Sequence, residues 1–307
     1  ENRRQRLGLD KLKFYDEGLS FADGNAIPQG TADDILAAGR KMYDDLSEET
    51  KEFAADLFDN ELLDVLSKEG KAPGGYCTSL PSYKVPFIFS NFNGTSADVD
   101  VLTHEAGHAF ESYTALRTQP ISSMAFSTSE INEIHSMAME HFAYPWMELF
   151  FGADADRYRY AHLAGALGVI PYMVSVDEFQ HRVYAKPDMT AAERREIWHE
   201  IEREYMPWRD YDGNEFLEQG GFWMQKQHIF LYPFYYIEYA LAQMGAFEFH
   251  GRAKAEREEA WNAYLALCRK GGSIGYFDLL SSAGLSNPFA EGTVKKIIGS
   301  IVDDLKL

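Results

Sequence analysis

Apolar and polar residues alternate with a helical period over most of this chain. Residues 31–47 and 47–67 each place apolar side chains three and four positions apart, open with Thr or Ser, and carry acidic residues in the first turn. These features predict two amphipathic helices. Helical patterns also dominate from residue 127 to the C-terminus, where they are interrupted by turn-forming segments at 185–190, 206–214 and 269–275. The pattern therefore predicts a mainly α-helical protein.

The segment from residue 71 to 95 has a different pattern. It contains paired glycines, prolines, and β-branched and aromatic residues between turn signals, a composition typical of short strands. The run VPFIFSNF at 85–92 is the strongest strand candidate in the chain. We expect a small β-sheet here, beside the helix that follows it.

Two further helices are predicted directly after this sheet. Ser96 is a candidate N-cap, and two aspartates follow it in the first helical turn. These features predict a helix over residues 97–116. Ser127 and Glu130 have the spacing of a capping box and predict the start of a second helix that runs through residues 131–142. These two helices carry the chemistry that the sequence suggests.

Composition narrows the class of protein. The chain of 307 residues is 46% hydrophobic and has no repeat or linker-like segment, so we expect a single globular domain over residues 1–307. A net charge of −19 excludes a general nucleic-acid binder, because phosphate neutralisation needs basic patches. No apolar run approaches the ~18–20 residues of a membrane span. With only two cysteines, far apart in the sequence, we expect a cytoplasmic protein without nucleic-acid or membrane partners.

The segment HEAGH at 104–108 is the clearest candidate for chemistry. His104 and His108 are four residues apart, so both imidazoles project from one helix face and could reach a single zinc ion. Glu105 lies about 100° round the helix from His104 and could accept a proton from water at the metal. The alternative is that both histidines are buried and satisfied by backbone carbonyls.

A catalytic zinc site needs a third protein ligand with one position left open. Glu130, Glu133 and Glu140 follow in the second predicted helix. Glu133 and Glu140 are seven residues apart and share a helix face. Residue spacing alone does not choose among these three acids.

These two segments together resemble the M3 family of zinc metallopeptidases, the group of oligoendopeptidase F and thimet oligopeptidase. In that family a glutamate ligand follows the second histidine of HExxH by 25 residues, and Glu133 follows His108 by 25 residues. Ser136 and Glu140 also match residues of the family's second helix. The resemblance thus implies one zinc ion per chain, held by His104, His108 and Glu133, with Glu105 as the catalytic base.

The resemblance extends over the whole chain, since residues 8–16, 202–213 and 271–289 are similar to segments of the oligoendopeptidase branch. Those segments belong to the C-terminal, catalytic half of the family's chains. We therefore expect a helical N-terminal region of the family to be absent here, and an N-terminal half of the same protein to be a candidate partner. At the position of Glu111, three residues after His108, many relatives carry His or Gln instead. We expect Glu111 to modify the environment of the metal ligands without abolishing the site.

The resemblance also implies residues that stabilise an oxyanion during peptide hydrolysis. The segment QHIFLYPFYYIEYA at 227–240 matches the family's downstream histidine and tyrosines. His228 is the histidine, and the tyrosine pair is either Tyr232 with Tyr239 or Tyr235 with Tyr239. The alternative for this stretch is an aromatic helix face packed in the core.

The segment around Gly74, Gly75 and Tyr76 is a candidate for binding substrate. Family enzymes resemble other zincins in offering an edge strand to which an extended peptide adds as a further strand. The glycines would permit close approach of the peptide backbone. Alternatively, the two glycines only form a turn.

The resulting hypothesis is a mainly α zincin with a small sheet beside the HExxH helix. It implies a zinc-dependent endopeptidase that hydrolyses internal bonds of short, unstructured peptides. The rival hypothesis is a non-catalytic or incomplete zinc-binding fragment that needs an N-terminal partner half.

Overall fold

The computed structural model describes all 307 residues, which form two compact units. The first unit comprises residues 1–25, 161–241 and 305–307, and the second comprises 26–160 and 242–304. The divisions fall within α7 (Ala155–Gly168) and α12 (Tyr236–Ala255) and at the end of α15 (Thr293–Leu305). Whether residues 1–307 act as one catalytic domain remains a prediction.

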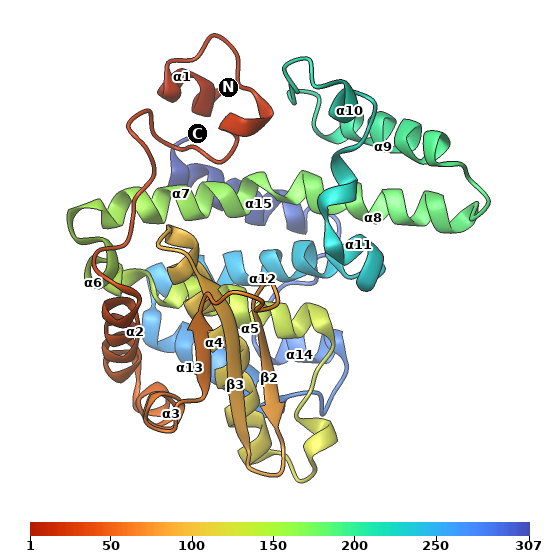
Figure 1. The fold of residues 1–307 in the computed structure, drawn as a ribbon. Helices are drawn as coiled ribbons and strands as arrows, with labels where there is room; N and C mark the ends of the chain where they lie inside the picture. Colours follow the sequence, from red (N-terminus) through yellow and green to blue (C-terminus); the bar gives the residue numbers. More distant parts are fainter. The chain divides into compact units, whose positions relative to one another are not determined.

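The chain is mainly α-helical with one small sheet, which confirms the predicted fold class (Figure 1). The first unit contains these helices: α1 (Asn2–Leu7), α8 (Ile170–Ala185), α9 (Ala191–Tyr205), α10 (Glu215–Glu218) and α11 (Gln227–Leu231). The second unit contains these helices: α2 (Ala32–Leu46), α3 (Glu48–Asp59), α4 (Ser96–Thr118), α5 (Ser129–Phe142), α6 (Glu148–Phe151), α13 (Arg257–Lys270) and α14 (Tyr276–Ser282). No helix is long and apolar enough to cross a bilayer.

The sheet of the second unit has the strand order β1-β3-β2, with β1 (Leu63–Leu66), β2 (Tyr76–Leu80) and β3 (Val85–Phe92). β1 runs parallel to β3, and β2 runs antiparallel to it. Every second residue of β3 is buried, as expected for a strand that packs on one face. That face lies against α4, and β2 is an edge strand whose outer side pairs with no other strand.

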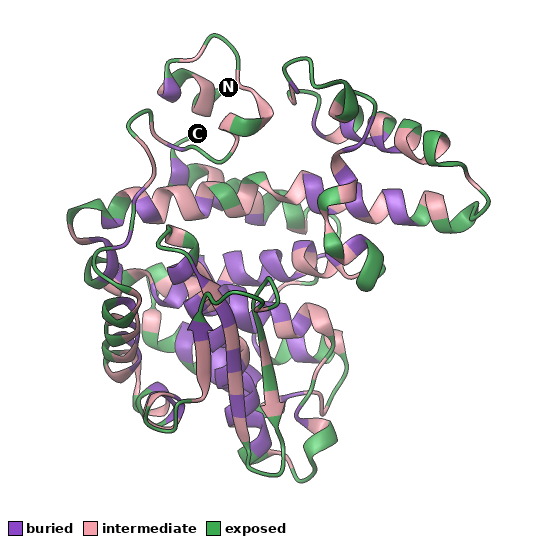
Figure 2. Cartoon of the chain, in the orientation of Figure 1, coloured by how far each residue is buried: buried purple, intermediate pink, exposed green.

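Helix α4 occupies the core of the second unit and packs against the sheet, α5 and α13. Figure 2 shows buried residues all along this helix. Phe110 on α4 and Phe142 on α5 both contact Tyr264 of α13, with ring centroids 6.3 and 5.2 Å apart. This aromatic packing holds the two helices that carry the candidate metal ligands.

The first unit has its own core between α8, α9 and the segment that follows them. Trp198 is fully buried, and its ring lies 5.9 Å from Tyr172 and 5.5 Å from Phe179. The indole Nε1–H of Trp198 donates a hydrogen bond to the buried Glu202, as do Arg209 and the hydroxyl of Tyr211. A buried carboxylate needs such donors, because an unpaired buried charge is costly.

The predicted capped starts of the helices at 31–47 and 47–67 are confirmed, since the Thr31 and Ser47 side chains accept hydrogen bonds from the first turns of α2 and α3. The prediction that the second helix continues to residue 67 is wrong. α3 ends at Asp59, and Leu63–Leu66 form β1 instead. The backbone of these residues pairs with β3, a partner that the local pattern cannot reveal.

The predicted starts of α4 and α5 are displaced by one or two residues. Thr95 is the N-cap of α4 rather than Ser96, and Asp98 accepts hydrogen bonds from the loop amides before the helix. α5 begins at Ser129, and the predicted capping box from Ser127 does not form, because the Ser127 hydroxyl donates to Asn132 instead. The three predicted interruptions after α8, α9 and α13 are all present.

Candidate metal-binding active site

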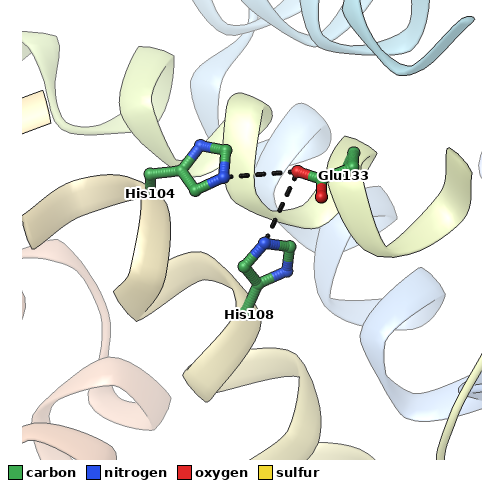
Figure 3. A group of neighbouring side chains, drawn as sticks. All are labelled: His104, His108 and Glu133. Atoms are coloured by element: carbon green, nitrogen blue, oxygen red, sulfur yellow. Dashed lines mark ion pairs between the residues drawn. The ribbon is translucent and has the colours of Figure 1, made fainter. Parts of the chain in front are cut away.

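Two neighbouring helices of the second unit bring three candidate ligands together. α4 supplies His104 and His108, and α5 supplies Glu133 (Figure 3). The Oε2 atom of Glu133 lies 3.2 Å from Nε2 of His104 and 3.5 Å from Nε2 of His108. The ligand atoms of the three side chains all lie within 4.8 Å of one another.

This donor set fits a tetrahedral zinc ion. Two ligand atoms that each lie ~2.0–2.1 Å from one ion at tetrahedral angles are about 3.3 Å apart. The distances of 3.2 and 3.5 Å from Glu133 to the two histidines agree with this value. Two imidazoles and one carboxylate also form the common ligand set of catalytic zinc, which leaves a fourth position open.

A second carboxylate orients one of the histidines. Nδ1 of His104 lies 2.6 Å from Oε1 of Glu140, and Nε2 of the same ring faces Oε2 of Glu133. Partners of this kind fix the tautomer and the ring orientation of a metal ligand. Glu130 makes no such contact, so the structure separates the three acids that residue spacing left open.

Glu133 is held by its own helix as well. The Ser136 hydroxyl donates to Oε2 of Glu133 at 2.9 Å and to its backbone carbonyl at 3.0 Å. Burial raises the pKa of Glu133, but the charges and hydrogen bonds of His108 and His104 outweigh it and hold the pKa well below its usual range. The histidines thus favour the charged form of this carboxylate, which is the form that binds a metal.

Gly107 sets the spacing between the two helices. A Cβ atom at this position would lie 2.6 Å from Cα of Ser136 and 2.7 Å from the carbonyl oxygen of His135. Only glycine permits this approach of α4 to α5. The sequence analysis did not single out Gly107, although a glycine inside a long apolar helix is a signal of close packing.

Glu105 lies on α4 among the ionisable side chains of the candidate site. Its side chain is buried, and this burial raises its pKa above the ordinary value, whereas the neighbouring histidines lower it. Its Oε1 atom would lie 3.4 Å from a Cβ added to Gly75. The backbone just before β2 therefore lies next to the candidate base.

The candidate substrate segment lies at this same place. Gly74 has a positive φ of 94°, and its carbonyl accepts a hydrogen bond from the Asn91 side chain at 3.0 Å. Tyr76 begins β2, is half exposed, and stacks on Phe89 of β3 with the ring centroids 4.9 Å apart. Gly74 lies in a bend before β2, and Gly75 lies against Glu105. Binding of a peptide at this segment remains a prediction.

The histidine and tyrosines predicted for oxyanion stabilisation form a cluster in the first unit. The ring of His228 lies 6.2 Å from both Tyr232 and Tyr235 and 6.1 Å from Tyr239. Tyr236, a further tyrosine of the matching segment that neither candidate pair includes, is closer at 5.4 Å and is buried. Tyr236 therefore fits the aromatic-core alternative, whereas Tyr232 is mostly exposed and does not.

Glu111, the departure from the family pattern, is buried three residues beyond His108. Burial raises the pKa of its carboxyl well above the ordinary value. It makes no hydrogen bond to a candidate ligand, and its Oε1 atom has no hydrogen-bond partner. Its effect on the metal remains a prediction.

Comparisons with known proteins agree with this geometry. The model of peptidase family M3 matches residues 41–298. Among curated proteins, the chain is 24% identical to oligopeptidase PepF of Bacillus subtilis over 92% of its own length and 42% of the relative. It is 26% identical to group B oligopeptidase PepB of Streptococcus agalactiae over 94% of its own length and 48% of the relative. The chain thus spans about half the length of these curated relatives.

Solved structures show the same relationship. PZ peptidase A with an inhibitor is 51% identical and superposes with a TM-score of 0.96 over 99% of this chain and 54% of that one. A protein described as an oligoendopeptidase F from Bacillus anthracis is 47% identical, with a TM-score of 0.87 over 100% of this chain and 53% of that one. The family model covers most of the sequence, and the two helices bring His104, His108 and Glu133 together. This chain belongs to peptidase family M3.

Proposed function

We propose that this chain forms the catalytic part of a zinc-dependent endopeptidase that hydrolyses internal bonds of short, unstructured peptides. The observation that carries the proposal is the group of His104, His108 and Glu133 with Glu105 on the same helix. Membership of family M3, and the oligopeptidase names of the relatives, support the substrate class.

His104, His108 and Glu133 would hold the metal, and a bound zinc ion supplies Lewis acidity and a water of lowered pKa. Glu140 holds the His104 ring through its Nδ1–H. Ser136 holds the Glu133 carboxylate. These contacts restrict the ligand side chains before the metal arrives, which reduces the cost of forming the site.

Glu105 is the proposed general base. Its carboxylate accepts a proton from the attacking water and then returns that proton to the nitrogen of the departing amine. Burial supports this dual role, because a raised pKa makes the protonated form accessible during the reaction. A glutamine at this position could not accept the proton.

The cluster of His228, Tyr232, Tyr235 and Tyr239 is proposed to donate hydrogen bonds to the oxyanion of the tetrahedral intermediate. The family resemblance supports this role. The edge strand β2 is proposed to bind the peptide backbone as an added strand, next to Gly74, Gly75 and Tyr76. Backbone pairing of this kind tolerates many side chains.

The second candidate function is a zinc-binding fragment that is inactive until an N-terminal partner half associates with it. The fact that the chain spans about half the length of its relatives favours this candidate. The buried Glu105 beside Gly75 opposes a site that only binds metal, because such a site has no use for a base there.

One experiment separates the two functions. Zinc content and cleavage of an internally quenched peptide are measured with and without a chelator, for the parent chain and for Glu105→Gln. The proposed endopeptidase binds about one zinc and cleaves the peptide, and the chelator removes both properties. Glu105→Gln should keep the zinc and lose cleavage.

A parent chain that binds zinc but cleaves only after an N-terminal half of a full-length relative is added would establish the fragment function. A chain that binds no zinc under either condition would contradict both functions. Zinc-independent cleavage that survives Glu105→Gln would come from a contaminating peptidase.

A further inference from the structure

A cavity with a volume of about 560 Å³ lies within the first unit. None of the residues assigned above to the metal, the base, the oxyanion or the peptide strand lines this cavity. Its size is within the range of cavities that bind small molecules.

Aromatic side chains form much of its wall. Tyr172 is 8% exposed, and its ring meets Phe222 edge to face with the centroids 5.8 Å apart. Trp208 also lines the cavity and is 53% exposed. Such walls favour a ligand with a flat apolar part.

The carboxylates at this cavity are already neutralised. The Arg209 side chain, 9% exposed, donates to both oxygens of Glu17 at 3.1 and 2.6 Å and to Glu202 at 3.2 Å. Glu1 accepts hydrogen bonds from Arg4 at 3.0 and 2.7 Å. Glu1 and Glu17, the two carboxylates that line the cavity, are therefore both paired with arginines and do not favour a cationic ligand.

Lys226 differs from these charged groups. Its ammonium group lies 5.5 Å from the ring of Tyr236 and 6.0 Å from the ring of Tyr172, and it forms no ion pair with a carboxylate. The hydroxyl of Tyr172 is buried and has no hydrogen-bond partner. Both groups can donate a hydrogen bond, and the charge of the ammonium group favours an anionic ligand.

We propose that this cavity binds an organic carboxylate that is joined to a flat apolar group. The carboxylate would accept hydrogen bonds from the Lys226 ammonium and, after a small change of the Tyr172 χ1 angle, from the Tyr172 hydroxyl. The apolar group would pack on Trp208 and Phe222. The C-terminal end of a peptide with an aromatic last residue and a free aromatic acid share this chemistry.

The test uses the full chain and three probes. N-acetyl-L-phenylalanine carries the carboxylate, and N-acetyl-L-phenylalaninamide is the matched neutral probe. Binding is followed by calorimetry and by quenching of Trp208 fluorescence. We expect saturable binding of the acid that is at least about tenfold tighter than binding of the amide, the effect of a charge-assisted hydrogen bond.

The third probe, N-acetyl-glycyl-glycyl-L-phenylalanine, distinguishes the two sources of the ligand. Tighter binding of this peptide than of the single amino acid assigns the cavity to peptide C-termini. Equal or weaker binding assigns it to small aromatic acids. Both outcomes support a carboxylate site.

Three variants locate the binding. Lys226→Met keeps the aliphatic stem and removes the charge, and Tyr172→Phe removes only the hydroxyl. Both substitutions should weaken binding of the acid and leave binding of the amide unchanged. The loss should be about tenfold for Lys226→Met. Lys186→Met is the control, because Lys186 pairs with Glu193 at the surface and does not line the cavity.

The proposal is overturned if the acid and the amide bind equally, if no probe saturates, or if Lys226→Met binds the acid as the parent does. Melting curves of each variant show whether it is folded. A fourth variant, Trp208→Phe, should abolish the fluorescence response while calorimetry still detects binding. Persistence of the full quench in that variant would place the probe elsewhere.

Discussion

The contact of α4 with α5 at Gly107 leads to a prediction about zinc affinity. In Gly107→Ala, the new Cβ would lie 2.6 Å from Cα of Ser136, whereas ordinary contacts begin at 3.4 Å. Because Ser136 Cα and the His135 carbonyl are backbone atoms, they cannot rotate away. The helices must therefore separate locally by about 0.8 Å, the shortfall in that contact.

This displacement is large enough to break the ligand set. Two atoms that both bind one zinc ion at ~2.0–2.1 Å cannot be more than about 4.2 Å apart. The distance between Glu133 and His108 is already 3.5 Å, and a shift of about 0.8 Å along it would exceed that limit. We expect zinc affinity to fall by at least about 10–100-fold.

Stability changes less than metal binding. Overpacking costs about 1–3 kcal/mol, and the better helix propensity of alanine offsets about 1 kcal/mol of it. The metal-free variant should thus melt a few degrees below the parent, roughly 2–5 °C. Zinc affinity is measured by competition with a chelator, and melting is measured with and without zinc.

Gly251→Ala is the matched control. Gly251 also lies inside a helix, but no atom lies within 4 Å of its added Cβ. This variant should be slightly more stable than the parent and should bind zinc equally well. Parent-like zinc affinity in Gly107→Ala would show that the α4–α5 contact does not set the ligand spacing.

Four further outcomes are expected. Glu105→Gln should retain zinc while turnover of a quenched peptide falls by about 10²–10⁴, the usual share of a general base, and near-normal turnover would exclude this role. Glu140→Gln should loosen His104 and weaken zinc retention by about 10–100-fold in a chelator competition, whereas an unchanged affinity would make that hydrogen bond dispensable. Tyr239→Phe should lower kcat by about 10²–10³ with little change in KM if its hydroxyl stabilises the oxyanion, and a lower melting temperature with unchanged kcat would indicate a core role. The pKa of Glu193 is lowered to about 2, first by the backbone amide of the α9 N-cap residue and then by a lysine side chain. Its stabilising effect is therefore complete above its ordinary pKa of 4.5 and is lost as the pH falls towards 2, so the difference in melting temperature between parent and Glu193→Gln should be larger at pH 7 than at pH 3.

Much of the local structure could be read from the sequence alone. The helices α2 and α3 begin where Thr31 and Ser47 occur, because a capping side chain and the apolar period are properties of neighbouring residues. The strand at 85–92 was likewise predicted from its composition. The shared face of His104 and His108 follows from the four-residue spacing once α4 is a helix.

The tertiary structure decided what depends on partners far away in the chain. Leu63–Leu66 form a strand only because β3 offers hydrogen bonds to them. Glu133 and Glu140 share a helix face, so the sequence pattern does not distinguish them. The packing of α5 on α4 at Gly107 places Glu133 at Nε2 of His104 and Glu140 at Nδ1 of the same ring. Periodicity describes one helix at a time, and the contact between two helices depends on packing that no single segment encodes.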